Sequence, residues 1–312
     1  DLFDFPDLYP VRRGYFPYLM SRGCAFRCTY CSAHALRDIH GAGARHWRYL
    51  SPRHAAEQLA RLLERHMPEA ETVQFLDSIL FPNRRWLREF APYYKDLVGR
   101  PFSCNLRADF VTEEVAALLA DMGCKTIRFG VESGDERMNA EVLDRGLGIE
   151  DLRRGFALTR AHGIERVAYN LVGLPQETLD LALSTVRLNA EIEPDLAIPF
   201  IFTPYPGTRL HAYCRERGMI SEREYDNYFS GVVTKLPGFP VHDILFVQRF
   251  FVSLMHLYGF AERLPEPWRP AWRRGLEAVL TSPLLPRRAI VAVRENYKHL
   301  RHIVGESLVT RS

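Results

Sequence analysis

Three of the six cysteines stand close together, as Cys24, Cys28 and Cys31 in the stretch RGCAFRCTYCSAH. Thiolates are the usual protein ligands of iron–sulfur clusters. Three thiolates can hold three irons of a [4Fe–4S] cluster and leave the fourth iron open to another molecule. The same cysteines with His34 would instead give three thiolates and one imidazole, a common structural zinc set. The spacing therefore predicts a metal centre and leaves both metals open.

These cysteines follow the first of six strand-like segments that alternate with helical patterns. Strands that alternate with helices predict βαβ units and a parallel sheet with right-handed crossovers. Residues at the ends of most strands suggest a closed or partly closed barrel, which gathers its chemistry at the carboxyl ends of the strands. The expected strands are 15–21, 72–78, 102–106, 126–133, 166–173 and 196–204.

The helices expected between these strands have recognisable ends. Ser51 and Pro52 predict a helix start, and Thr112 predicts another that closes at Gly123. Two further helices are expected over 149–162 and 177–192. After about residue 215 the alternation stops, and the tail is helical in pattern with proline-rich breaks. The sequence thus predicts a core barrel over 15–215 and a helical extension over 216–312.

The bulk composition describes an ordinary globular chain. It has 312 residues, of which 47% are hydrophobic. Its net charge of +3 is too small to indicate binding to nucleic acid. Few cysteines favour a reducing, cytoplasmic setting over a secreted disulfide framework, and no signal peptide is recognisable. The most apolar stretch, 244–260, carries Gln248, Arg249 and His256, so we expect no membrane span.

The CxxxCxxC pattern, with the aromatic Tyr30 before its third cysteine and a strand before it, resembles the radical S-adenosylmethionine (radical SAM) superfamily. The resemblance implies a partial (β/α)6 barrel of the TIM type. It also implies that Cys24, Cys28 and Cys31 hold a [4Fe–4S] cluster whose open iron is chelated by SAM. Reductive cleavage of SAM would then give methionine and a 5′-deoxyadenosyl radical, which abstracts a hydrogen from substrate.

Three later strand ends carry further resemblance, in FGVESG, YNLVGLPQET and PYPGT. They imply contacts to SAM, near Tyr30, from Glu132, Ser133, Asn170 and Tyr205. Ser133 is equally suited to cap the helix that follows it. We expect Glu177 to cap the next helix rather than to bind SAM.

The second and third strand ends fit less closely. Asp77 and Ser78 stand where many members have a GGEP-type motif that contacts the SAM amino group, and the resemblance implies that Asp77 would substitute for that motif. Arg107 could pair with the SAM carboxylate as a fork donor, or with Asp109 or Glu132 as a structural ion pair. Both alternatives stay open at this point.

The residues of these motifs are most similar to those of the cobalamin-dependent branch of the superfamily, whose members usually carry an N-terminal cobalamin domain. Residues 1–14 resemble the linker that would follow such a domain, so cobalamin is expected only through a domain absent from this sequence. DIHGAG at 38–43 matches a cobalamin signature, but it falls inside the first crossover and is read as chance. The remaining cysteines, Cys104, Cys124 and Cys214, are interpreted as small buried hydrophobes.

The sequence therefore predicts a radical SAM enzyme that methylates or cyclises an unknown small-molecule substrate. Its expected electron donor is a protein such as flavodoxin or ferredoxin. The alternatives are a cobalamin-free member, like the methylthiotransferases or coproporphyrinogen oxidases, and a non-catalytic zinc module for RNA. Trp268 and Trp272 lie in a basic tail. We interpret that tail as a solvated helical surface rather than as an RNA-binding face.

Overall fold

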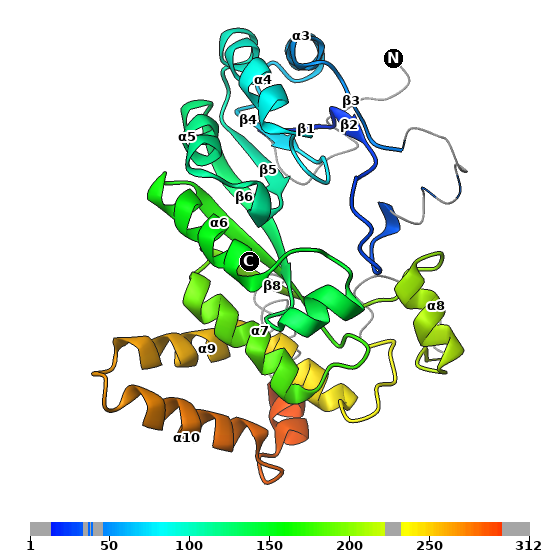
Figure 1. Ribbon diagram of the computed structural model, residues 1–312, viewed down its shortest axis with the longest axis vertical. Coiled ribbons are helices and arrows are strands. Elements are labelled where there is room, and N and C mark those ends of the chain that lie inside the picture. The colour runs from blue at the N-terminus through cyan, green and yellow to red at the C-terminus, as the bar shows by residue number, and fades with distance from the viewer. Residues whose placement is uncertain (1–13, 34–36, 38, 40–45, 222–231, 295–312) are drawn as a thin grey trace, which may run out of the picture.

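The computed structural model describes residues 14–33, 37, 39, 46–221 and 232–294. At its centre lies a six-stranded sheet in which every neighbouring pair is parallel and the strands follow the order of the chain (Figure 1). Such a sheet with helical crossovers confirms the predicted α/β partial barrel. The strands are β1 (Tyr15–Tyr18), β4 (Thr72–Phe75), β5 (Phe102–Leu106), β6 (Cys124–Glu132), β7 (Glu165–Val172) and β8 (Leu196–Ile201).

Each connection between neighbouring strands of the sheet, from β1 through β8, contains a helix that packs on the outer face of the sheet. Thr112 and Thr178 begin α5 and α7 by accepting hydrogen bonds from the backbone N–H of Val115 and Leu181, at 3.4 and 3.3 Å. The expected helices are present as α3 (Pro52–His66), α5 (Glu113–Asp121), α6 (Ile149–Ala161) and α7 (Leu179–Ile192).

One crossover helix, α4 (Arg84–Leu97), which contains Pro92, was not predicted from the sequence. Its start was readable, since Asn83 accepts a hydrogen bond from the backbone N–H of Trp86 at 2.9 Å. Proline in a helix interior removes a backbone donor and usually ends the helix, which hides this element in the sequence. Burial of Trp86, Phe90 and Tyr94 against the sheet outweighs that cost.

The two faces of the sheet are chemically different, because successive side chains of a strand point to opposite faces. On β6, Ile127, Phe129 and Val131 are buried in the core that the helices cover. Arg128 and Gly130 therefore belong to the concave face, which forms the barrel interior. The register shifts between Gly130 and Glu132, and the Glu132 carboxylate returns over Gly130 on that face. This alternation decides which strand residues can reach a molecule bound inside the barrel.

Short elements complete the carboxyl-end edge of the sheet. A two-residue pair, β2 (Ser21–Arg22) with β3 (Arg48–Tyr49), flanks the segment that follows β1. A single 3-10 turn, η1 (Ala108–Phe110), follows β5, and a π-helix, η2 (Met138–Val142), follows β6. Helix α8 (Arg209–Glu216) follows β8. These elements surround the cysteine segment.

The C-terminal part consists of α9 (Val241–Arg263) and α10 (Arg269–Thr281), with α9 lying along α7. Val186 and Ala190 of α7 share a hydrophobic cluster with Val247 and Phe251 of α9. The extension therefore covers the last part of the barrel instead of standing apart from it. The predicted boundary at residue 215 falls inside α8.

Among the described residues, Val241–Ala261 is long and apolar enough to cross a membrane by length and composition. Gln248, Arg249 and His256 therefore do not by themselves make this helix too polar to span a membrane. Core helices of folded domains satisfy the same criterion. Here Ile244, Val247 and Phe251 are buried against the barrel, so the absence of a membrane span stays a prediction.

Candidate functional site

The cysteine segment enters the site through a glycine that nothing else could replace. Gly23 has φ +78°, and a Cβ placed there would lie 1.7 Å from the carbonyl oxygen of His46. Glycine alone tolerates both the positive φ and this close approach of backbone. The backbone of His46, just before β3, thus packs directly against Gly23. This contact fixes where the segment with Cys24 leaves the sheet.

The middle of the segment is tied to two other loops. The backbone N–H of Thr29 donates to the carbonyl of Leu143 at 3.0 Å, and its hydroxyl donates to Val142 at 2.6 Å. Leu210 of α8 donates its N–H to the carbonyl of Thr29 at 2.9 Å. The segment is therefore held between η2 and α8 at the carboxyl end of the sheet.

All three cysteines, Cys24, Cys28 and Cys31, are free thiols and half-buried. Burial raises the pKa of the Cys28 thiol, and the positive charges of Arg145 and Arg107 partly oppose that rise. Cations near a thiol favour the thiolate, the form that binds metal. The donor set and its electrostatic surroundings thus suit a cluster.

No group of three His, Cys, Asp or Glu side chains is close enough to hold a metal within the described ranges, so these thiols do not converge there. His34 and all of DIHGAG except Ile39 lie outside those ranges, as do residues 1–13 of the expected linker. The zinc alternative, which needs His34, is therefore not tested by the geometry.

Tyr30 and Glu132 meet at the centre of the site. The Tyr30 hydroxyl donates to Glu132 Oε1 at 3.0 Å, which joins the cysteine segment to the end of β6. Glu132 has φ +64°, an unusual conformation for a residue with a side chain. Its carboxylate folds back over Gly130, where an added Cβ would lie 2.5 Å from Glu132 Oε1.

Arg145 is a further site residue that the sequence analysis missed. Its guanidinium donates to the carbonyls of Val131 and Gly130, at 2.7 and 2.6 Å, while its buried Nε has no partner among the described residues. Burial raises the pKa of Glu132, and Arg145 and then Tyr30 oppose this rise. The strand-end rule could not find Arg145, because it lies in a loop beyond η2.

Arg107 forms an ion pair with Asp109, one of the two partners expected for a structural role. It binds Asp109 with two hydrogen bonds, of 3.0 and 2.8 Å, and it donates to the carbonyl of Arg145 at 2.8 Å. Its guanidinium also stacks over Phe26, 3.6 Å from the ring centre. Its partner is Asp109 rather than Glu132, and its role toward SAM stays a prediction.

Asp77 is fully buried and binds backbone within the sheet edge. It accepts hydrogen bonds from the N–H of Met20, at 3.2 and 3.3 Å, and from the Ser21 hydroxyl. These bonds tie the end of β4 to the segment after β1. Asp77 therefore positions the start of the cysteine segment, and a contact from it to SAM stays untested.

Asn170 makes its side-chain contacts on the helix-covered side of β7, and its role toward SAM stays a prediction. Its side chain exchanges hydrogen bonds with Asn189 of α7, at 3.2 and 2.7 Å, and is fully buried. The alternation along β7 puts Tyr169 on the concave face and Asn170 on the helix-covered face. Asn170 is thus placed as a strand-to-helix contact and points away from a molecule bound inside the barrel.

The remaining predicted residues divide by exposure. Ser133 is buried, and its hydroxyl accepts a hydrogen bond from the N–H of Asp135 at 3.2 Å, in keeping with the turn-capping alternative. Tyr205 is 38% exposed, in the loop before α8. Glu177 does not cap α7, because Thr178 does, and it binds the N–H groups of Gly173 and Leu174 instead.

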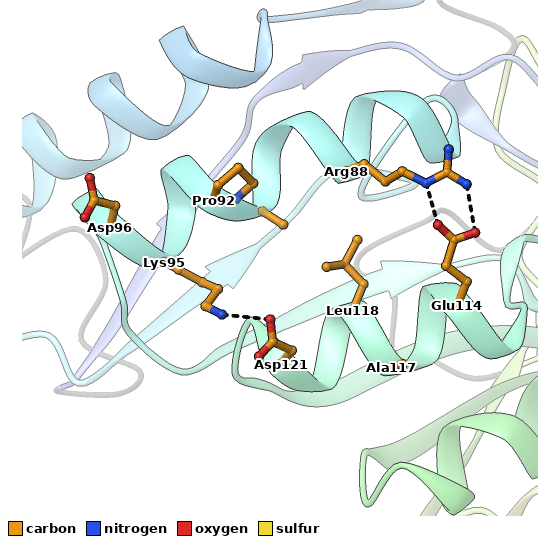
Figure 2. A pocket seen from close by; sticks show the side chains of 9 residues that line it. Arg88, Pro92, Lys95, Asp96, Glu114, Ala117, Leu118 and Asp121 are labelled. Carbon is orange, nitrogen blue, oxygen red and sulfur yellow. Dashed lines mark hydrogen bonds and ion pairs between the residues drawn. The ribbon is translucent and has the colours of Figure 1, made fainter.

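A separate groove lies between α4 and α5, on the outside of the barrel (Figure 2). Two ion pairs bridge the groove. One joins Arg88 and Glu114, and the other joins Lys95 Nζ and Asp121 Oδ2 at 2.8 Å. Exposed pairs of this kind contribute little to stability or recognition. None of the candidate site residues lines this groove, so it plays no part in the site.

The family model of the radical SAM superfamily matches residues 18–188, which run from the last residue of β1 through the cysteine segment, Glu132 and Arg145 into α7. An uncharacterized methyltransferase of Pyrococcus horikoshii is 25% identical over 211 residues, covering 67% of this chain and 44% of the relative. An anaerobic magnesium-protoporphyrin IX monomethyl ester cyclase of Rubrivivax gelatinosus is 22% identical over 217 residues, covering 68% and 37%.

Among solved structures, a radical S-adenosylmethionine methyltransferase from Kitasatospora setae, with cobalamin and a [4Fe–4S] cluster bound, has a similar fold. Its TM-score is 0.55 at 18% sequence identity, over 68% of this chain and 38% of that chain. This chain spans less than half the length of each of these three proteins.

Proposed function

Because the chain belongs to the radical SAM superfamily, it is a radical SAM enzyme, and we propose that Cys24, Cys28 and Cys31 hold its [4Fe–4S] cluster. The observation that carries this proposal is the position of the cysteine segment at the carboxyl end of β1, beside Tyr30, Glu132 and Arg145. When bound, the cluster supplies the electron that cleaves SAM and starts radical chemistry.

The residues of this chain have distinct tasks in that proposal. Tyr30 and Glu132 join the cysteine segment to β6, and Glu132 presents a carboxylate that can accept a hydrogen bond from the SAM amino group. The buried Nε–H of Arg145 is a donor suited to the SAM carboxylate. Arg107 and Asp77 fix the loops on either side through ion-pair and backbone contacts.

We further propose that the reaction is cobalamin-dependent, a methyl transfer or a ring closure on a small molecule. Support comes from the relatives, which include a methyltransferase and a cyclase, and from a fold match solved with cobalamin bound. A corrinoid would be carried by a part of the protein outside the present sequence. The cobalamin-free and zinc alternatives remain as outcomes of the tests.

The first test is the change Cys28→Ala, with Cys214→Ala as a matched control on α8. After anaerobic reconstitution, Cys28→Ala should lose cluster iron and 5′-deoxyadenosine formation, since two thiolates cannot hold a cluster with one open iron. Cys214→Ala should keep both. A Cys28→Ala protein that still forms 5′-deoxyadenosine at the parent rate would refute the assignment.

The second test separates the alternatives by metal and corrinoid. Protein purified anaerobically should contain iron and sulfide, whereas one zinc per chain that is lost in His34→Ala would establish the zinc module. Corrinoid-dependent methylation or cyclisation by the full-length protein would support the cobalamin branch. Turnover without any corrinoid would assign a cobalamin-free reaction.

A further inference from the structure

The concave face of the sheet encloses a hollow of about 720 Å³, lined by side chains from all six strands. Closed parallel barrels fill this interior with bulky branched side chains. Here several interior positions carry small polar residues, among them Thr72, Ser103 and Thr126. The hollow is therefore left open by the sequence, and its volume lies within the range of small-molecule sites.

Two cations line this hollow, Lys125 and Arg128, and Arg128 is the less exposed of the two. Its Nη2 donates to the Ser103 hydroxyl at 3.1 Å, while its Nη1 is shielded from solvent and has no hydrogen-bond partner in the described part of the chain. The carboxylate that lines the hollow, Glu165, accepts a hydrogen bond from Thr126 at 2.9 Å instead. A shielded cationic donor without a partner is costly, and an anion in the hollow would supply that partner once Arg128 turns its Nη1 toward it.

The neighbouring wall of the hollow is apolar and aromatic. Val167 and Tyr169 of β7 and Ile198 of β8 line it, and the ring of Tyr169 contacts the edge of Phe200 at 5.6 Å between centres. Val167 is the register partner of Arg128 on the adjacent strand. A molecule that fits both features carries a negative group beside an apolar body.

The lining of the hollow begins at the first residues of the strands, such as Tyr15, Thr72 and Glu165, and extends as far as Tyr169, toward the carboxyl ends near which the cysteines stand. Arg128 and Gly130 share the concave face of β6, and Gly130 has no side chain to separate Arg128 from the Glu132 carboxylate. The Glu132 carboxylate folds over Gly130, two residues from Arg128, which corresponds to about 7 Å along the strand. One end of a small molecule anchored at Arg128 would therefore face the site of Glu132 and Tyr30.

We propose that this hollow binds the substrate, and that the substrate carries an oxyanion, a carboxylate or a phosphate, held by Arg128 while its apolar body lies against Val167 and Tyr169. The inference rests on the proposed function, because it places the reacting end of the substrate beside the radical site. It adds a chemical class and a specificity-determining residue to that function.

The test uses three small probes of similar shape with the reconstituted protein: 3-phenylpropionate, phenethyl phosphate and the neutral 3-phenylpropionamide. Binding is followed by isothermal titration calorimetry and by ligand-observed NMR. At least one anionic probe should bind, the amide should bind about ten-fold more weakly or worse, and Arg128→Met should remove the difference. Which anion binds better tells carboxylate from phosphate.

Arg84→Met on α4 is the matched control, since it removes an equal charge from an exposed position outside the hollow. It should bind like the parent. Val167→Trp, which fills the hollow, should abolish binding of the anionic probes while the protein keeps a cooperative melting transition. Equal binding of amide and anions, or parent-like affinity in a folded Arg128→Met protein, would overturn the anchor.

The same preparation separates this inference from the proposed function. If the parent protein holds its cluster and cleaves SAM but shows no anion preference, the anchor is wrong and the function stands. If the parent forms no cluster while the probes still bind at Arg128, the function is wrong and the anion site stands.

Discussion

Glu132 and Arg145 are the pair of residues on which the site depends electrostatically. Glu132 ends β6, and Arg145 reaches it from the loop after η2, where it donates to the carbonyls of Val131 and Gly130. Its charge opposes the rise that burial imposes on the pKa of Glu132. Removing one member of a buried charge pair leaves the other uncompensated.

We predict that Arg145→Met lowers the free energy of unfolding by roughly 3–5 kcal/mol near pH 8. A raised carboxyl pKa in the folded protein means that stability falls as pH rises, so the loss should be smaller at pH 5. The double change Glu132→Gln with Arg145→Met should recover part of it. Urea unfolding of the four proteins of this cycle at both pH values is the measurement. Additive losses would show that the two residues do not interact.

Asn170 offers a test of the face on which it lies. Asn170→Leu should cost about 1–3 kcal/mol of stability, because Asn189 loses a buried partner, while SAM affinity stays at the parent value. The double change Asn170→Leu with Asn189→Leu should cost less than the sum. Melting curves measure the change in stability, and SAM titration of the folded protein measures the change in SAM affinity. Weaker SAM binding without a melting change would support the predicted ligand role.

Glu177 gives a pH dependence of stability. Burial raises its pKa to about 8, against the lowering effect of the Gly173 and Leu174 N–H groups. Stability is therefore fully present below the ordinary carboxyl pKa, falls as pH rises toward 8, and levels off above it. Glu177→Gln should match the parent near pH 5 and exceed it by a few kcal/mol near pH 9, since one pKa unit is about 1.4 kcal/mol.

Chemical unfolding across that pH range measures the effect, with Glu141→Gln on the exposed side of η2 as the control. The control should follow the parent at every pH. Parallel curves for the parent and Glu177→Gln would show that this carboxyl does not change charge on folding.

At the scale of elements, the entry to the cysteine segment is set by backbone contact between β2 and β3. Gly23→Ala should displace Cys24, because its Cβ would collide with the carbonyl of His46. We expect clear loss of cluster iron after reconstitution. Gly218→Ala is the control: it has the same sign of φ, +62°, but nothing within 4 Å of an added Cβ. Parent-like iron content in Gly23→Ala would show that the segment tolerates the shift.

The elements also show what the sequence could reveal and what it could not. Period-two alternation and helix caps such as Thr112 lie within short windows, so all six strands of the sheet and four crossover helices were predictable. Helix α4 was hidden by Pro92, whose cost only tertiary packing offsets. The direction of Asn170 depends on one residue of strand register, which a motif does not specify. Arg145 reaches the site from a loop, through contacts that exist only in the folded chain.

For the molecule as a whole, the C-terminal helices share a core with the barrel. Phe251→Ala should cost about 3–5 kcal/mol, as expected for a buried aromatic side chain, and should lower the stability of the entire chain in one transition. Its neighbour Val252 is 40% exposed, so Val252→Ala should change little. Two separate transitions, with only one shifted by Phe251→Ala, would show that the extension is an independent unit.

The strand order of the sheet has a consequence for how the chain is made. Within the six-stranded sheet, each strand after β1 pairs with the sheet strand that precedes it in the chain, so every βα unit can dock on a finished edge as it leaves the ribosome. The thiols proposed to hold the cluster emerge soon after the first strand of the sheet, whereas the partner of Tyr30, Glu132, follows 102 residues later. During synthesis the thiols are thus present well before the pocket that shelters them, and we expect the nascent chain to accept its cluster only once β6 has joined the sheet.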